Sequence, residues 1–152
     1  MLKYIKQELS KIDAKATREA VEVELERALF YKITDIDRKE AKMISAYGDA
    51  VSESQRSNVT SDSTAQIATH NVSIEEERNA HIFRVERAIS RLNKKQRELI
   101  TRRYMVEYGV TDLDVYLDMN IGAPTYTKIR NEAVYMLAFI LRVYVEIKEG
   151  DA

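Results

Sequence analysis

Apolar residues in the first third of the chain recur at intervals of three and four, which is typical of the buried face of a helix or coiled coil. Further along, Thr34 is followed three residues later by Asp37, an approximate capping box that predicts a second helix from about residue 35. Two helices joined near residue 34 would form a hairpin over residues 1–50. We expect this hairpin either to pack on the rest of the chain or to form a surface for dimerisation. The apolar stripe comprises Leu2, Ile5, Leu9, Ile12, Ala16, Val21, Leu25, Ala28 and Leu29.

The apolar pattern stops at residues 51–72. This segment is rich in Ser, Thr, Asn and Gln and poor in large apolar residues. Such a composition is typical of a linker or loop. We therefore predict three parts: the N-terminal hairpin, the polar segment, and a C-terminal domain at residues 73–149.

Helix-start signals divide the C-terminal domain. In each, a residue that can cap a helix is followed three positions later by an acid or amide, a pattern typical of a capping box. The last signal precedes a short helix predicted over about 112–119, a turn at residues 120–122, and a longer helix from about Ala123. Pro124 would lie in the first turn of that helix, where its missing N–H is harmless. The three signals are Ser73 with Glu76, Asn93 with Gln96, and Thr111 with Asp114.

The layout of residues 111–137 is that of a helix-turn-helix, in which the second helix lies in the DNA major groove. It fits an ordinary helical hairpin equally well. The helix that follows the turn continues into residues 134–147, which are apolar on more than one face. This surplus of apolar surface would pack on the N-terminal hairpin or form a symmetric dimer interface.

Composition favours an all-α fold. Of 152 residues, 45% are hydrophobic, which is enough for a core, and one proline and four glycines leave few helix breakers. The absence of cysteine excludes disulfides and thiolate metal sites. The N-terminus lacks an apolar signal-peptide core, and the run 134–145 is interrupted by Arg142 and too short to span a bilayer. We therefore expect a cytoplasmic protein with no membrane partner.

Charge is unevenly distributed along a chain whose net charge is −1. Residues 74–108 contain nine Lys or Arg and six Asp or Glu, a net charge of +3. Residues 109–132 contain two basic and four acidic residues, a net charge of −2. Because phosphate contacts supply most non-specific DNA affinity, this acidic balance disfavours tight binding by an isolated monomer.

Motifs for catalysis are lacking. His70 and His81 are far apart and fit no metal-ligand spacing, and we expect both to be solvent-exposed. The chain has neither a glycine-rich phosphate loop nor a nucleophile elbow. We therefore expect no enzyme, no catalytic residue, no cofactor and no metal site.

Two stretches together resemble the ArpU-like phage transcriptional regulators: LNKKQRELITRRYM at 92–105 and the predicted helix-turn-helix at 111–138. The resemblance covers about residues 73–145, and the same region is more distantly similar to the promoter-reading domain of sigma factors. It implies a phage or prophage protein that controls late gene transcription in a bacterial cytoplasm. The matching positions are Leu92, Leu99, Ile100, Arg103, Tyr104 and Met105 in the first stretch, and Thr125, Tyr126, Ile129, Ala133, Leu137 and Ala138 in the second.

The sequence departs from the family at the start of the second helix. Gly122 stands where a capping Ser or Thr is usual, and Ala123 and Pro124 stand where basic residues are usual. Asn131 and Glu132 also replace expected basic residues. These differences weaken the expected anion binding, so we expect DNA binding to need a dimer or the basic helices upstream.

DNA contacts can be assigned by position as hypotheses. Lys128 would contact a phosphate or a guanine edge, and Asn131 suits adenine. For each basic residue the alternative is a solvated surface charge. The candidates are Thr125, Thr127, Lys128, Arg130 and Asn131 on the groove-facing side, with Lys94, Lys95, Arg102 and Arg103 as backbone anchors.

The expected partners are double-stranded DNA and a second copy of the chain in a homodimer. The alternative function is a protein-interaction module on the same scaffold, which binds RNA polymerase or another phage factor.

Overall fold

The computed structural model is all-helical, as predicted. It describes residues 3–48 and 61–150, with side chains for 3–35, 66 and 69–150. Within these residues the only β-type pairing is an isolated bridge between Ile12 and Glu146. The elements are α1 (Lys3–Leu9), α2 (Ala14–Gly48), α3 (Ser61–Ser90), α4 (Lys94–Ile100), a π-helical segment η2 (Thr101–Met105), α5 (Asp112–Asp118) and α6 (Ala123–Leu141).

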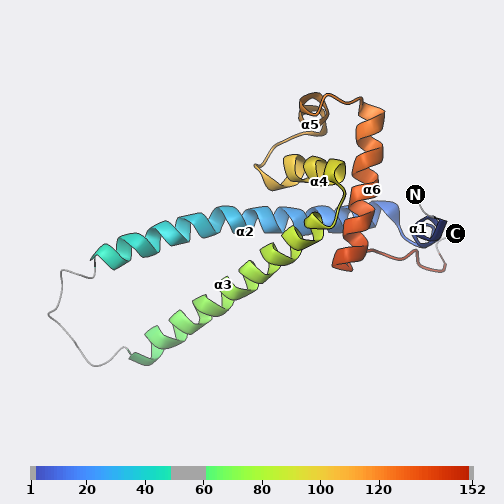
Figure 1. Cartoon of the computed structure of the whole chain (residues 1–152). Coiled ribbons are helices and arrows are strands. Elements are labelled where there is room, and N and C mark those ends of the chain that lie inside the picture. Colours follow the sequence, from blue (N-terminus) through green and yellow to red (C-terminus); the bar gives the residue numbers. More distant parts are fainter. Residues whose placement is uncertain (1–2, 49–60, 151–152) are drawn as a thin grey trace.

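One continuous helix, α2, replaces the hairpin predicted over residues 1–50 (Figure 1). The helical structure is instead interrupted earlier, between α1 and α2, where the Asp13 carboxylate accepts a hydrogen bond from the Ala16 N–H at 3.0 Å. Thr34 starts no new helix, because its hydroxyl donates to the Phe30 carbonyl one turn back, at 2.9 Å. A threonine bonded in this way is compatible with a helix interior. The predicted second helix from about residue 35 was therefore wrong.

The helix α3 begins at Ser61, twelve residues before the predicted start at Ser73. The prediction of a loop was therefore wrong for residues 61–72, while residues 51–60 lie outside the described part of the chain. The Ser73–Glu76 pair lies inside α3 and does not mark the start of the helix. Residues 61–72 are mostly polar, so the sequence shows no apolar period there from which a helix could be predicted.

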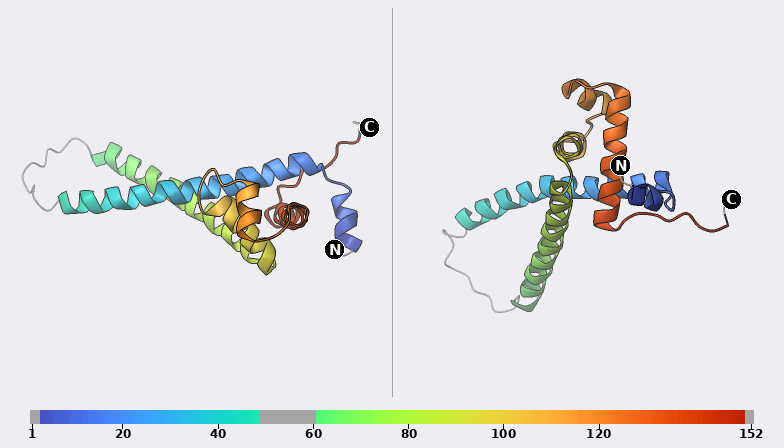
Figure 2. Two further views of the ribbon diagram at one scale, coloured as in Figure 1. Left: turned by 90° about the horizontal axis from the view of Figure 1, so that it is seen from above. Right: turned by 45° about the vertical axis from the view of Figure 1, so that its right-hand side comes forward.

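The core is built around α6, which packs on α2, α3 and α4. In Figure 1 it crosses α2, and α4 lies beside its middle. From two other directions, Figure 2 shows that α2 and α3 both extend away from α6, crossing in the left view and diverging in the right view. Residues of the predicted N-terminal part thus share one apolar cluster with those of the C-terminal domain. The cluster includes Val21, Leu25, Ala28, Val85, Ala88, Leu92, Leu99, Ile100, Val115, Tyr126, Ala133, Val134, Leu137 and Ala138.

Beyond α6 the chain turns back along the start of α2. The helix ends at Leu141, and Arg142 adopts a left-handed backbone with φ 58°. The Val145 N–H donates to the Thr17 hydroxyl at 2.9 Å, and the Ile147 N–H donates to the Lys11 carbonyl at 3.0 Å. Within residues 134–147, Val134, Leu137, Ala138 and Leu141 are buried and α6 packs on α2, as the first of the two explanations predicted, whereas Val145 and Ile147 stay exposed. Among the described residues, no helix combines the length and hydropathy that a membrane span requires.

Candidate nucleic-acid interface

The unit formed by α5, the turn and α6 has almost the predicted helix bounds. Thr111 caps α5 in the predicted capping box: its hydroxyl accepts from the Asp114 N–H, and the Asp114 carboxylate accepts from the Thr111 N–H at 2.8 Å. The box predicted at Asn93 and Gln96 is likewise present at the start of α4. In the turn, Asn120 takes the left-handed conformation (φ 54°) that asparagine tolerates.

Asp112 joins α5 to both neighbouring elements. One carboxylate oxygen accepts hydrogen bonds from the Tyr126 hydroxyl at 2.6 Å and the Arg103 Nε at 2.9 Å. The other accepts from Arg130 Nη1 at 3.0 Å. Burial acts to raise the pKa of the Asp112 carboxyl, but the hydrogen bonds from Tyr126 and Arg103 and the two positive charges lower it further than burial raises it. Asp112 is therefore held as an anion and fixes the angle between α5 and α6.

We expected Arg130 to face solvent or DNA, and this prediction was wrong. The residue is 8% exposed, and its guanidinium lies between Asp112 and the side-chain oxygen of Asn131, 3.3 Å away. Asn131 is correspondingly half-buried. The Nε of Arg130 has no hydrogen-bond partner among the described residues. The spacing of apolar residues within α6 predicted that Arg130 lies on the polar side of the helix. The sequence alone could not show that the Asp112 carboxylate of α5 forms an ion pair with it.

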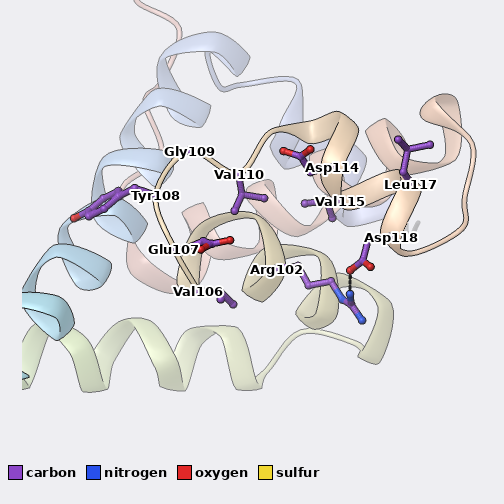
Figure 3. Close-up of a pocket in the computed structure, with 10 residues that line it drawn as sticks. All are labelled: Arg102, Val106, Glu107, Tyr108, Gly109, Val110, Asp114, Val115, Leu117 and Asp118. Atoms are coloured by element: carbon purple, nitrogen blue, oxygen red, sulfur yellow. Dashed lines mark hydrogen bonds and ion pairs between the residues drawn. The ribbon is translucent and has the colours of Figure 1, made fainter.

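The two arginines of η2 are also engaged within the chain. Arg103 pairs with Asp112 and lies over the Tyr104 ring, 4.7 Å from its centroid. Arg102 pairs with Glu98 at 3.0 Å and with Asp118, toward which it points in Figure 3. Arg103 is partly buried, whereas Arg102 is 41% exposed and remains accessible.

The first turns of α6 are open to solvent. Thr125, Thr127 and Lys128 are exposed, and Lys128 makes no ion pair with any described residue. The Thr127 hydroxyl donates to the Ala123 carbonyl at 3.0 Å, which leaves its lone pairs free to accept. Gly122 supplies no side-chain cap, so N–H groups at the start of α6 are unsatisfied by side chains.

A basic corner lies where α3 passes into α4. Lys94 and Lys95 are exposed, as predicted, and Arg87 and Arg91 are exposed beside them in sequence. None of the four forms an ion pair within the part of the chain that the structure describes. The two arginines were missed, although their spacing of four in a helical pattern placed them on one face. Because α4 packs on α6, this corner and the exposed turns of α6 belong to adjoining helices.

Three of the four acidic residues in 109–132 bond to groups within the chain. Asp112 is neutralised by Arg103 and Arg130, and Asp118 by Arg102. Asp114 caps α5, and the hydrogen bonds from Thr111 lower its pKa. The net charge of −2 therefore overstates the negative charge available to repel DNA near α6.

A second surface feature is an open hollow of about 910 Å³ between η2, the loop after it and α5. Figure 3 shows the residues that line it. Val106, Tyr108 and Leu117 line it and are 63, 51 and 66% exposed. Clustered apolar exposure of this kind is typical of a protein-binding surface.

The two histidines differ in environment. His70 is exposed, as expected. His81 is not: only 10% of its side chain is exposed, because it packs edge-on to Tyr31 and lies beside Glu24 of α2. Among the described residues, no group of histidines and carboxylates is arranged to hold a metal ion.

Comparisons with models of protein families, with curated proteins and with solved structures found no match to this chain.

Proposed function

We propose that the protein is a DNA-binding regulator of the ArpU-like kind, which controls phage or prophage transcription in a bacterial cytoplasm and inserts the start of α6 into the major groove. The observation that carries this proposal is the exposed first two turns of α6, with Thr125, Thr127 and Lys128 accessible after a tight turn from α5. Side chains at the start of the second helix are those that contact base edges in helix-turn-helix proteins.

The basic corner supplies the backbone contacts in this proposal. Lys94 and Lys95, with Arg87 and Arg91, would contact phosphates and fix the position of the protein on the duplex. Arg102, whose ion pair with Asp118 is exposed, would also contact a phosphate. Arg103 and Arg130 would instead stabilise the α5–α6 unit through their ion pairs with Asp112. A twofold dimer would double these contacts and place two readers on a palindromic site.

DNA binding is tested by fluorescence anisotropy with a labelled duplex of about 30 base pairs, long enough for two half-sites. A random-sequence duplex measures non-specific affinity between about 50 and 200 mM salt. Lys94→Ala with Lys95→Ala should reduce the slope of log K against log salt by about 2, near 0.9 for each lost phosphate contact. Selection from a random duplex library then identifies a preferred site.

Lys148→Ala is the matched control, since this exposed lysine follows the segment paired with Lys11, near the N-terminal end of α2. It should leave both the salt slope and the selected site unchanged. On the selected site, Lys128→Ala should reduce affinity by ~10-fold or more, the loss of about one base contact. A wild-type protein that binds no duplex at about 50 mM salt would contradict the proposal.

The hollow beside α5 favours a second candidate function, a module that binds RNA polymerase or another phage factor. Its exposed apolar residues, Val106, Tyr108 and Leu117, lie after η2 and in α5, outside the helix that carries Thr125 and Lys128. Leu117→Asp should abolish binding to purified bacterial RNA polymerase in a pull-down assay and leave DNA affinity unchanged. If wild-type protein binds DNA but not the polymerase, only the first candidate stands.

A further inference from the structure

Tyr108 lies at the centre of an apolar surface that is larger than the hollow beside α5. Its side chain lines that hollow and two further ones, of about 260 and 480 Å³, which are both bordered by α2. Figure 3 shows its ring extending toward α2 from the loop after η2. The three hollows therefore form one continuous surface, which we call the Tyr108 surface. Its exposed apolar side chains are Val23, Phe30, Val106, Tyr108 and Leu117.

These apolar side chains are not part of the core. Leu25 of α2 and Val115 of α5 are the residues by which these helices join the buried cluster. Val23 and Phe30, on α2, are nevertheless 52 and 48% exposed. A surface helix needs only one apolar face, and exposed apolar groups gathered from several elements are typical of a binding surface.

Every positive charge that lines the Tyr108 surface already has a partner within the chain. Three arginines line the hollows, and each forms an ion pair with a carboxylate of the described residues. A partner molecule would therefore find no free cation on this surface. The pairs are Arg27 with Glu24, Arg102 with Asp118, and Arg103 with Asp112.

The charges of this surface that lack a counter-charge are all negative. Glu26 and Glu107 are exposed and line the 260 Å³ hollow together with Tyr108. Neither carboxylate forms an ion pair or a hydrogen bond with a described residue. Asp114, at the edge near α5, hydrogen-bonds to Thr111 but pairs with no described cation. Apolar side chains surrounded by unpaired carboxylates are complementary to a ligand that is both apolar and cationic.

We propose that the Tyr108 surface binds a basic, apolar segment of another protein, in which Lys or Arg side chains stand next to large apolar ones. A cation of this segment enters the hollow between Glu26 and Glu107 and lies against the Tyr108 ring, where the aromatic face also attracts it. The neighbouring apolar side chains of the segment pack on Phe30 to one side and on Leu117 to the other. This inference rests on the second candidate function and deepens it, because it assigns the chemistry of the partner.

The same charges argue against two other occupants. Carboxylates without a counter-charge repel DNA phosphates, and the exposed cations of the basic corner lie on α3 and α4 instead. A second copy that bound through the same surface would bring unpaired carboxylates toward one another, because a twofold interface uses the same patch on both subunits. A basic segment of a different protein avoids both repulsions.

Selection from a library of random displayed peptides tests the proposal with the full-length chain. The enriched sequences should contain Lys or Arg beside Leu, Ile, Phe or Trp. A synthetic peptide of the consensus sequence is then titrated with the protein in a fluorescence anisotropy assay. Phe30→Ser should weaken its binding roughly tenfold or more, although Phe30 lies outside the hollow beside α5.

A charge-reversal cycle tests the role of the carboxylates. Glu26→Lys with Glu107→Lys should weaken binding of the selected peptide roughly tenfold or more. A second peptide, in which Glu replaces each Lys and Arg, should bind this double variant more tightly than it binds wild type. Glu76→Lys with Glu77→Lys is the matched control, since both glutamates are exposed on α3 and line none of the three hollows. All the altered side chains are exposed, and circular dichroism verifies that each variant is folded.

Three results would overturn the proposal: no enriched peptide, a consensus that is acidic or uncharged, or binding that the reversal of Glu26 and Glu107 leaves unchanged. If RNA polymerase binds in the pull-down assay but the selected peptides are not basic, the second candidate function stands and this inference fails. If the peptides are basic and the charge-reversal cycle holds but the polymerase does not bind, the inference stands with another protein as the partner. Loss of DNA binding would affect neither.

Discussion

Replacing Asp112 with alanine tests how α5 is fixed to its neighbours. The change removes the acceptor of three hydrogen bonds and leaves Arg130 without a counter-charge. Removing one partner of a buried ion pair costs about 3–5 kcal/mol, whereas an exposed pair contributes below about 1 kcal/mol. Here the Arg130 side chain is 10% exposed and that of Asp112 37% exposed, so the site lies between these limits. We expect a loss of about 2 kcal/mol in unfolding free energy.

That loss corresponds to a fall of about 4–8 °C in the midpoint of thermal unfolding for a chain of this length. It is measured by circular dichroism and checked by urea unfolding. Asp118→Ala is the matched control because it removes the same charge from the same helix. Its pair with Arg102 is exposed, with side-chain exposures of 41 and 64%, so the expected loss is about 0.5 kcal/mol or less. Equal losses in the two variants would refute the assigned role of Asp112.

Three further predictions concern pH, helix continuity and the C-terminal segment. Folding lowers the pKa of the Asp112 carboxyl, so its ion pairs stabilise the protein above the ordinary pKa of 3.8. That stabilisation is lost as the pH falls through the lowered pKa. The difference in unfolding free energy between wild type and Asp112→Asn, measured in urea, should therefore shrink only below about pH 4. Thr34→Ala should raise the unfolding free energy by several tenths of a kcal/mol if α2 is continuous, whereas loss of a helix cap would lower it by about 1 kcal/mol. Thr17→Val leaves the Val145 N–H without its acceptor and should cost about 1–2 kcal/mol in urea unfolding, with Thr17→Ser as the control that keeps the hydroxyl; equal stabilities would contradict the pairing of these segments.

The sequence located the α5–α6 unit because its signals are local. A capping box at Thr111, a turn asparagine and a proline at the start of α6 act within a few residues, and each is present as predicted. Both bounds of α5 and the start of α6 differed by one residue at most from the predicted ones, whereas α6 ends at Leu141, before the end of the apolar run at residue 147.

Errors arose where a local signal has two possible outcomes or where a distant contact decides. Thr34 resembles a helix start, yet its hydroxyl donates to the Phe30 carbonyl within the same helix and α2 continues. Arg130 resembles a surface residue on the polar side of α6, yet Asp112, eighteen positions earlier, draws it inward. The pattern of one helix cannot predict a charged partner that the tertiary fold brings from another.

The bond between Thr17 and Val145 also bears on how the protein folds during its synthesis. These residues are separated by 128 positions, and the buried face of α2 packs on α6, which follows it late in the chain. At about 5–20 residues per second, a ribosome adds Val145 roughly 6–25 s after Thr17. Throughout that interval Val21 and Leu25 lack their α6 neighbours, so the nascent chain presents an apolar helix to chaperones before the core can close.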